Sequence, residues 1–309
     1  MAGHTPSDGI LAGDRRALGR AITAIEDARP EATEILRAIA GRGGDAHVVG
    51  ITGAPGSGKS TLTSALIGAI RGAGRTVAVV AVDPSSPLLG GAILGDRIRM
   101  VEHALDEGVF VRSVAARGHL GGLSRTTAQV VDLLDAVGFD VVIVETVGSG
   151  QSETEVMHLA HTVVVVTAPG LGDEVQAIKA GVLEIADVFV VNKADSPFAE
   201  KTARILHDAL GSAGDGWIQP IVETIALDGT GVPELLRAIE THATHLGPGA
   251  RAEAATARAR RQLAAAAADA LAADLLASDA PEVTELALRV ASGDASLDEA
   301  GRAARRLAE

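Results

Sequence analysis

The feature that most constrains the fold is the segment of residues 53–60, whose sequence GAPGSGKS matches the phosphate-loop pattern GxxxxGK[ST]. An apolar run that ends at Thr52 precedes this segment, and a helical stripe that includes Leu62, Leu66 and Ile70 follows it. The glycines let the chain turn so that consecutive N–H groups point at phosphate oxygens, and the dipole of the following helix adds to this attraction. The segment therefore predicts a strand, a phosphate loop and a helix in direct succession.

Short β-branched runs alternate with helical segments between residue 47 and about residue 245. Several of these runs are apolar throughout, which is typical of strands covered by helices on both faces. We therefore expect an α/β fold with a doubly wound, mostly parallel sheet, and the pattern leaves the order of the strands open. The strand candidates are residues 48–52, 77–82, 109–114, 141–145, 163–167, 188–192 and 220–226.

Helical patterns lie on both sides of this core. Leu18, Ile22 and Ile25 share one helical face near the start of the chain, and the Ala-rich sequence after about residue 250 contains no strand pattern. A hinge with the sequence HLGPGA precedes the Ala-rich zone. We therefore predict an N-terminal helical extension (1–45), a phosphate-loop (P-loop) NTPase domain (46–247) and a C-terminal helical arm (248–309).

The charge balance and the cysteine count exclude several classes of function. The chain carries 27 Lys and Arg against 40 Asp and Glu, a formal net charge of −13. Nucleic acid and anionic membranes both attract a basic face, so this balance argues against either as a partner. With no cysteine, the chain has no disulfide, no thiolate metal site and no cysteine nucleophile. Its apolar runs are too short to span a membrane and its first residues lack a secretory signal, so we expect a cytoplasmic protein.

The residue types in the phosphate loop specify its chemistry. Lys59 places a cation on the β- and γ-phosphates of a nucleotide, and the hydroxyl of Ser60 can ligate Mg²⁺. Lys59 is therefore a candidate catalytic residue and Ser60 a candidate metal ligand. The residues expected to hold the nucleotide in this loop are Gly53, Pro55, Gly56, Ser57, Gly58, Lys59 and Ser60.

A second motif, Asn192-Lys193-Ala194-Asp195, lies at the end of the apolar run VFVVN. A carboxylate at the Asp195 position can accept hydrogen bonds from guanine N1–H and from the exocyclic amine, and adenine offers neither donor in that geometry. The stem of Lys193 can lie over the base, and Asn192 can brace neighbouring loops. Together with the phosphate loop, this motif predicts binding of GTP and GDP rather than ATP.

Three acidic residues are candidates for a metal site. Asp83 ends the run VAVD, Glu145 ends the run DVVIVE, and Asp96 lies in the segment GGAILGDRIRM. A carboxylate beside the phosphates can hold Mg²⁺ or its water, and the N–H of Gly148 can meet the γ-phosphate. We therefore assign Ser60, Asp83, Asp96 and Glu145 to the metal, and Lys59, Asp96, Glu145 and Gly148 to catalysis.

Longer segments around these residues resemble the MeaB/ArgK family of GTPases. The segments are AVDPSSP, GGAILGDRIRM, ARGHLGGLS, VIVETVGSGQSE, PGLGDEVQAIKAGVLEIAD and VVNKAD, and the likeness extends over about residues 10–245. Members of this family act as chaperones of adenosylcobalamin-dependent methylmalonyl-CoA mutase. The resemblance implies a Mg²⁺-dependent GTPase that yields GDP and phosphate, gates cofactor loading of the mutase and protects it.

The resemblance also implies roles for individual positions. Thr61 joins the residues that hold the phosphates and the metal. Residues 148–153 become a switch that senses the γ-phosphate, and residues 176–184 transmit the nucleotide state to the mutase. The loop beside guanine, where the family usually has a Ser-Ala pair, corresponds to Ile225, Ala226 and Leu227, and the Ala226 N–H can still donate to guanine O6. The helical arm implies a homodimer.

Three other functions are compatible with parts of the sequence. A metal-insertion GTPase shares the fold, although such proteins usually carry a Cys or His cluster and this chain contains no cysteine. A P-loop kinase would use the same phosphate loop, although the NKAD motif favours guanine over adenine. A nucleotide-regulated binding module would bind GTP with negligible turnover, and single-turnover hydrolysis would separate it from a GTPase.

The remaining polar features do not predict a further site. His242 and His245 have i, i+3 spacing without a third ligand, so we interpret them as surface or helix-end groups. Gln151 is interpreted as structural, because Ser149 occupies the place after Gly148 where Ras-like proteins carry their catalytic glutamine.

Overall fold

The computed structural model describes residues 6–43, 45–84, 102–103, 105–116, 125–146, 155–170, 182–210 and 216–307. The chain divides into two compact units, Met1–Thr256 and Ala257–Glu309. The first unit contains the sheet, and the second is helical. Among the helices that the structure describes, none is long and apolar enough to cross a membrane.

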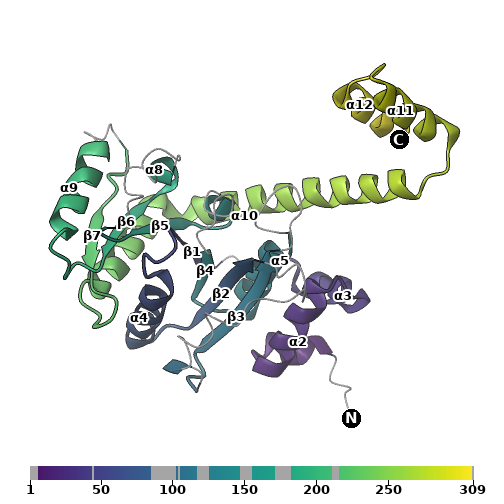
Figure 1. Ribbon diagram of the computed structural model, residues 1–309. Coiled ribbons are helices and arrows are strands. Elements are labelled where there is room, and N and C mark those ends of the chain that lie inside the picture. Colours follow the sequence, from purple (N-terminus) through teal and green to yellow (C-terminus); the bar gives the residue numbers. More distant parts are fainter. Residues whose placement is uncertain are drawn as a thin grey trace, which may run out of the picture. The chain divides into compact units, whose positions relative to one another are not determined.

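Seven parallel strands form one sheet in the order β3-β2-β4-β1-β5-β6-β7 (Figure 1). The expected α/β fold is confirmed, and each of the seven runs proposed from the sequence contains a strand. The order places β1 between β4 and β5, so the phosphate loop leaves from the middle of the sheet. The strands are β1 (His47–Thr52), β2 (Val77–Pro84), β3 (Val109–Ala116), β4 (Val141–Thr146), β5 (Thr162–Thr167), β6 (Val188–Asn192) and β7 (Ile221–Thr224).

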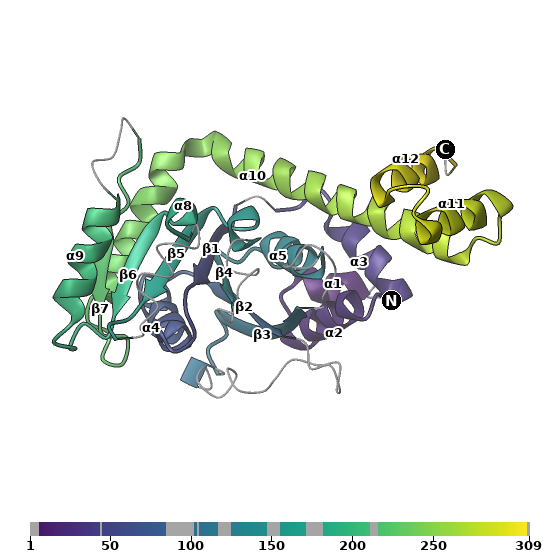
Figure 2. The same cartoon turned by 45° about the horizontal axis from the view of Figure 1, so that its top comes forward.

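Helices cover both faces of the sheet (Figure 2). Successive strand residues point to opposite faces, so Ile143 packs with α4 and the first part of α10, whereas Val142 and Val144 pack with α2 and α5. The helices are α1 (Pro6–Leu11), α2 (Arg15–Glu26), α3 (Pro30–Ile39), α4 (Lys59–Gly72), α5 (Arg125–Val137), α8 (Val182–Ile185), α9 (Ala199–Leu210), α10 (Val232–Ala277), α11 (Pro281–Ser292) and α12 (Leu297–Leu307), with a short 3₁₀ helix at Val156–His158.

The N-terminal helices belong to the same compact unit as the sheet. Leu18 and Ile22 of α2 are fully buried in the core cluster that includes α5. Arg112 of β3 donates to Thr23 Oγ1 at 2.9 Å and to Glu26 Oε2 at 3.2 Å. These contacts join the edge strand β3 to α2.

Gly247 interrupts the long helix α10. Its φ of 73° and ψ of 174° are non-helical, so α10 consists of two helical stretches joined at this residue. Gly247 lies in the segment HLGPGA that the sequence marks as a hinge.

In the second unit, Ser296 and Glu299 form reciprocal contacts at the start of α12. The Ser296 backbone N–H donates to Glu299 Oε2 at 3.1 Å, and the Glu299 N–H donates to Ser296 Oγ at 3.3 Å.

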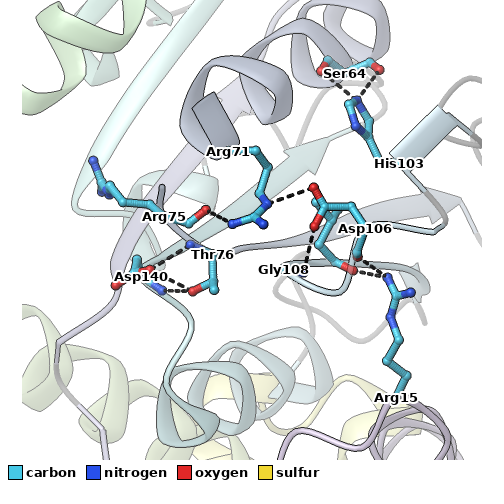
Figure 3. A network of polar contacts seen from close by, with 10 residues as sticks. Arg15, Ser64, Arg71, Arg75, Thr76, His103, Asp106, Gly108 and Asp140 are labelled. Carbon is cyan, nitrogen blue, oxygen red and sulfur yellow. Dashed lines mark hydrogen bonds and ion pairs between the residues drawn. The ribbon is translucent and has the colours of Figure 1, made fainter. Parts of the chain in front are cut away.

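Polar contacts attach α4 to the connection that leads into β3 (Figure 3). Arg71 donates to Asp106 Oδ2 at 2.9 Å and to the Arg75 carbonyl at 2.7 Å. Gly108 leaves room for this arrangement, because a Cβ there would lie 2.2 Å from the guanidinium carbon of Arg71. Two turns nearer the N-terminus of α4, Ser64 Oγ lies 3.1 Å from His103 Nε2. The helix that begins at the phosphate loop is therefore attached to this connection at two positions, Ser64 and Arg71.

A row of polar side chains in mutual contact crosses the amino end of the sheet. Thr162 Oγ1 lies 2.8 Å from His47 Nε2 and 2.9 Å from His242 Nδ1. Asp187, which directly precedes β6, continues the row, because its Oδ1 lies 3.3 Å from His242 Nε2. His242 is only 3 % exposed, so its interpretation as a surface or helix-end group is wrong. It is buried because α10 packs across the ends of β1 and β5.

Burial is the main cause of the shifted pKa values of the three titratable groups in this row, His47, His242 and Asp187. It lowers the pKa of His47 to about 3, with repulsion from His161 as the next cause. It lowers the pKa of His242 to about 4, with a further contribution from His245. Burial also raises the pKa of the Asp187 carboxyl to about 6. At neutral pH both imidazoles are therefore uncharged while Asp187 is ionised.

Acidification is expected to destabilise the protein through His47 and His242. Their ordinary pKa of 6.5 applies in the unfolded chain, so below that pH the unfolded state binds more protons than the folded state. Asp187 offsets part of this loss between pH 6 and 3.8, because there the folded state holds the extra proton. We expect the free energy of unfolding, measured with urea, to fall as the pH is lowered from 6.5 towards 4.

The substitution His47→Gln tests this origin of the pH dependence. It should reduce the slope of unfolding free energy against pH by up to about 1.4 kcal/mol per pH unit, the value for one proton. His207→Gln is the matched control, because His207 is an exposed histidine of α9 and is solvated in both states. An unchanged slope in His47→Gln would contradict the assignment.

Candidate active site

The phosphate loop has a backbone that only glycine can adopt at its key positions. Gly53 has a φ of 136°, and a Cβ there would lie 2.0 Å from the Val166 carbonyl oxygen of β5. Gly58 has a φ of 92° and immediately precedes α4. The sheet and the helix therefore fix both ends of the loop, which lies at the N-terminus of α4, where the helix dipole attracts a phosphate.

Lys59 lies across this loop. Its side chain is 6 % exposed, and its Nζ donates to the carbonyls of Gly53 at 2.7 Å and Ala54 at 3.1 Å. Two of the contacts of the ammonium group are therefore with uncharged carbonyl oxygens of the loop itself. Phosphate oxygens are stronger acceptors for the same donors, so a bound nucleotide can replace these contacts.

Ser60 and Glu145 come together although 85 residues separate them in the sequence. The Ser60 hydroxyl donates to Glu145 Oε1 at 2.6 Å, and both residues are buried. The parallel pairing of β1 and β4 causes this, because it sets Ile51 opposite Glu145 beside the start of the phosphate loop. A hydroxyl and a carboxylate are the hard oxygen donors that Mg²⁺ prefers, so these residues fit the expected metal.

The other predicted metal and switch residues are placed only in part. Asp83 lies near the end of β2, at the same edge of the sheet, and is in register with Ala115. Asp96, Gly148 and the rest of residues 148–153 lie outside the described residues, as do residues 176–181. Of the segment 176–184, the structure describes the part within α8.

Asn192 connects three parts of the nucleotide site. Its Nδ2 donates to the Ser57 carbonyl of the phosphate loop at 2.9 Å. Its Oδ1 accepts from Thr224 Oγ1 at 3.1 Å and from the Ala226 N–H at 3.1 Å. A single buried amide thus positions the loop after β6 and the loop after β7 against the phosphate loop.

The base-recognition residues surround this amide. Lys193 has a positive φ of 59°, and its Nζ donates to the Gly56 carbonyl at 2.9 Å. Asp195 is exposed two residues later and is available to a base. The two motifs proposed for phosphate and guanine therefore lie side by side at the carboxyl edge of the sheet.

In the loop after β7, the Ala226 N–H is already engaged. It donates to Asn192 Oδ1 at 3.1 Å, so the guanine contact that the family resemblance implies must share or replace that bond. The loop itself is closed, because the Ile225 N–H donates to the Thr230 carbonyl at 2.9 Å. Leu227 is 90 % exposed at its tip. This closure also ends β7 at Thr224, earlier than the sequence suggests.

Sequence reasoning missed the threonines that end the strands at this edge. Thr224 supports Asn192, and Thr146 Oγ1 donates to Thr52 Oγ1 at 2.9 Å. Thr52 and Thr146 are both fully buried. The available signal was their shared place, each at the end of a β-branched run and next to a residue that the sequence analysis assigns to the site.

Comparison with known proteins identifies a family. The family model for the methylmalonyl-CoA mutase-associated GTPase MeaB matches residues 18–280. A protein of Pyrococcus abyssi with a GTPase name is 52 % identical over 235 residues, covering 74 % of this chain and 72 % of its own. The GTPase ArgK of Escherichia coli is 40 % identical over 237 residues, with coverage of 74 % and 72 %.

Two further similarities extend this result. The mouse mitochondrial protein named methylmalonic aciduria type A homolog is 32 % identical over 247 residues, covering 74 % of this chain and 60 % of its own. A crystal structure described as LAO/AO transport system kinase matches 98 % of this chain and 96 % of its own, with a TM-score of 0.73 and 28 % identity. The P-loop fold is thus found in a solved relative over nearly the whole chain.

Two glycines, one at the start of α4 and one within it, test the geometry of the site. Gly58→Ala should weaken GTP and GDP binding at least about tenfold, because a Cβ would lie 2.3 Å from Asn192 Nδ2 and because the φ is positive. Gly68→Ala is the control, since nothing lies within 4 Å of a Cβ in the middle of α4. It should keep the affinity and stabilise the protein by about 0.5–1 kcal/mol. Titration with a fluorescent nucleotide and urea unfolding would measure both, and equal affinities would contradict the proposed geometry.

Proposed function

Because the chain belongs to the MeaB family of GTPases and hydrolyses GTP, we propose that it serves as a chaperone of an adenosylcobalamin-dependent methylmalonyl-CoA mutase. In this role it would gate cofactor loading and protect the mutase. The family description and the name of the mouse relative support the choice of partner.

The contact between Ser60 and Glu145 is the observation that carries the catalytic assignment. It brings a hydroxyl and a carboxylate together one residue from Lys59. In the proposed site, Ser60 and Glu145 would hold Mg²⁺, with Asp83 and Asp96 as further acidic groups. The metal would neutralise charge on the β- and γ-phosphates.

The residues of the chain then act on the nucleotide as follows. Lys59 exchanges its carbonyl contacts for phosphate oxygens and stabilises the charge that spreads over the transferred phosphoryl group. Asp195 accepts from guanine, while Asn192 keeps the base and phosphate halves in register. Water attacks the γ-phosphorus, the bond to the β-phosphate oxygen breaks, and GDP and inorganic phosphate leave.

We also propose the switches and the dimer that the family resemblance implies. Residues 148–153 would sense the γ-phosphate, and residues 176–184 would transmit the nucleotide state to the mutase. The helical arm at 248–309 would join two copies of the chain. Coupling between two binding sites is reciprocal. If a bound nucleotide changes the affinity of this protein for the mutase, then the mutase must change the affinity of this protein for that nucleotide by the same factor.

The description of the solved relative as a kinase makes phosphoryl transfer the second candidate. The two activities differ in what accepts the γ-phosphate. If radiolabelled γ-phosphate is recovered as inorganic phosphate with and without the mutase, transfer is to water. Label recovered on a protein or a small molecule would favour the kinase instead.

Nucleotide choice is expected to depend on Asp195. The wild-type protein should bind GDP and GTP far more tightly than ADP and ATP, since each buried group left unpaired costs about 1–3 kcal/mol. Asp195→Asn should shift the preference towards xanthine nucleotides, which present an acceptor where guanine has a donor. Competition titrations with guanine, adenine and xanthine nucleotides provide the measurement. Asp208→Asn, which changes an exposed carboxyl on α9, provides the control. Equal affinity of the wild type for ATP and GTP would contradict this role.

The mutase is expected to accelerate hydrolysis. A cobalamin-dependent acyl-CoA mutase should raise the GTPase rate at least about tenfold, equivalent to about 1.4 kcal/mol of barrier. Gln176→Ala and Lys179→Ala should weaken this acceleration and leave nucleotide affinity nearly unchanged. Lys201→Ala, on the exposed side of α9, is the control and should leave both unchanged. An unchanged rate, with equal mutase binding in the GTP, GDP and nucleotide-free forms, would leave the GTPase assignment without this partner.

A further inference from the structure

Two buried hydroxyls form the last connection between β1 and β4. The backbone pairing of these strands extends to Ile51 opposite Glu145. At the next rung, Thr146 Oγ1 donates to Thr52 Oγ1 at 2.9 Å. The side chains are almost completely buried, with exposures of 0 % for Thr52 and 1 % for Thr146. After this rung, β1 continues into the phosphate loop.

The burial of this pair is not explained by stability alone. By strand periodicity, Thr52 and Thr146 share the sheet face of Val48, Val142 and Val144, all of which are fully buried. Valine has nearly the shape of threonine without the hydroxyl. Replacing both partners of a buried hydrogen bond by apolar groups of the same shape is close to neutral. A pair of valines would therefore fill this rung, and the hydroxyls need another reason.

The neighbours of the pair suggest that reason. Thr52 directly precedes Gly53, whose carbonyl accepts from Lys59. Thr146 directly follows Glu145, which accepts from Ser60. The bond between the two hydroxyls thus spans the phosphate loop and the strand that carries the metal-binding carboxylate. A directional bond of 2.9 Å sets the spacing of these two parts, whereas a contact between methyl groups would let them slide.

We infer that Thr52 and Thr146 are positioning residues for GTP hydrolysis, which hold Glu145 at the correct distance from the phosphate loop. Mg²⁺ requires near-ideal octahedral geometry, with ligands at about 2.0–2.1 Å, so it tolerates little change in that spacing. A displacement of about 1 Å in a catalytic group can cost about a hundredfold in rate. The inference rests on the proposed metal role of Ser60 and Glu145.

The test compares single and paired substitutions by valine. Thr52→Val and Thr146→Val each leave one buried hydroxyl unpaired and should lower the Tm, whereas the double variant should recover most of it. The double variant should nevertheless have a kcat about tenfold below wild type and a raised Mg²⁺ requirement, with GDP affinity within about twofold. Thr146→Ser keeps the hydroxyl and should retain the wild-type kcat and Mg²⁺ dependence.

A matched control lies at the other end of the same sheet. Thr162 is also a fully buried, hydrogen-bonded strand threonine, and Thr162→Val should lower the Tm without changing kcat or the Mg²⁺ requirement. If the double valine variant does not fold, Thr146→Val measured below its Tm against Thr146→Ser decides the same question.

The outcomes separate this inference from the proposed function. A double valine variant, or a folded Thr146→Val, with the kcat and Mg²⁺ dependence of the wild type overturns the positioning role. If Glu145→Gln raises the Mg²⁺ requirement while the threonine variants do not, the metal role of Glu145 stands and only the positioning role fails. If Glu145→Gln also leaves the requirement unchanged, the proposed metal site fails first.

Discussion

The parallel pairing of β1 with β4 and β5 is the interaction on which the candidate site depends. It sets Ile51 opposite Glu145 on one side and Thr52 opposite Val165 on the other. A slip of one residue would turn Glu145 to the opposite face of the sheet, away from Ser60. The register is strongly specified because both faces of β1 and β4 are buried against helices. Apolar packing thus sets the strand register that brings the Glu145 carboxylate beside the Ser60 hydroxyl.

The parts of this arrangement that a local pattern controls were predictable. The phosphate loop, the seven strands and the nearness of the two nucleotide motifs follow from runs and motifs of a few residues each. The burial of His242 was not predictable, because its spacing from His245 is the same on a surface helix and on one packed across the strand ends. The N–H of Ala226 is a similar case, since its engagement with Asn192 depends on a residue 34 positions away. Such contacts arise from strand order, which the alternation of elements does not encode.

Polar groups are concentrated at both ends of the sheet, and they differ in what they interact with. At the amino end, the polar groups contact one another: Thr162 is hydrogen-bonded to His47 and His242, and His242 contacts Asp187. Such a row offsets the cost of its own burial and makes stability depend on pH. At the carboxyl end, Lys59 and Ser60 contact carbonyl and carboxylate groups that a nucleotide and a metal can replace. The first set connects elements of the fold to one another, and the second set would, in the proposed site, exchange its contacts for those of ligands.

This exchange explains how the site combines rigidity with ligand binding. Asn192 fixes the loops after β6 and β7 against the phosphate loop through three hydrogen bonds, none of which involves Lys59, Ser60 or Glu145. In the proposed site, this scaffold would not have to reorganise if Lys59 contacts a phosphate or Glu145 a metal. Since the scaffold is already ordered by folding, more of the binding energy of a nucleotide would be available to order the proposed switch segments around Asp96, Gly148 and residues 176–184. A partner that binds those segments would then respond to the γ-phosphate rather than to the base, which both GTP and GDP share.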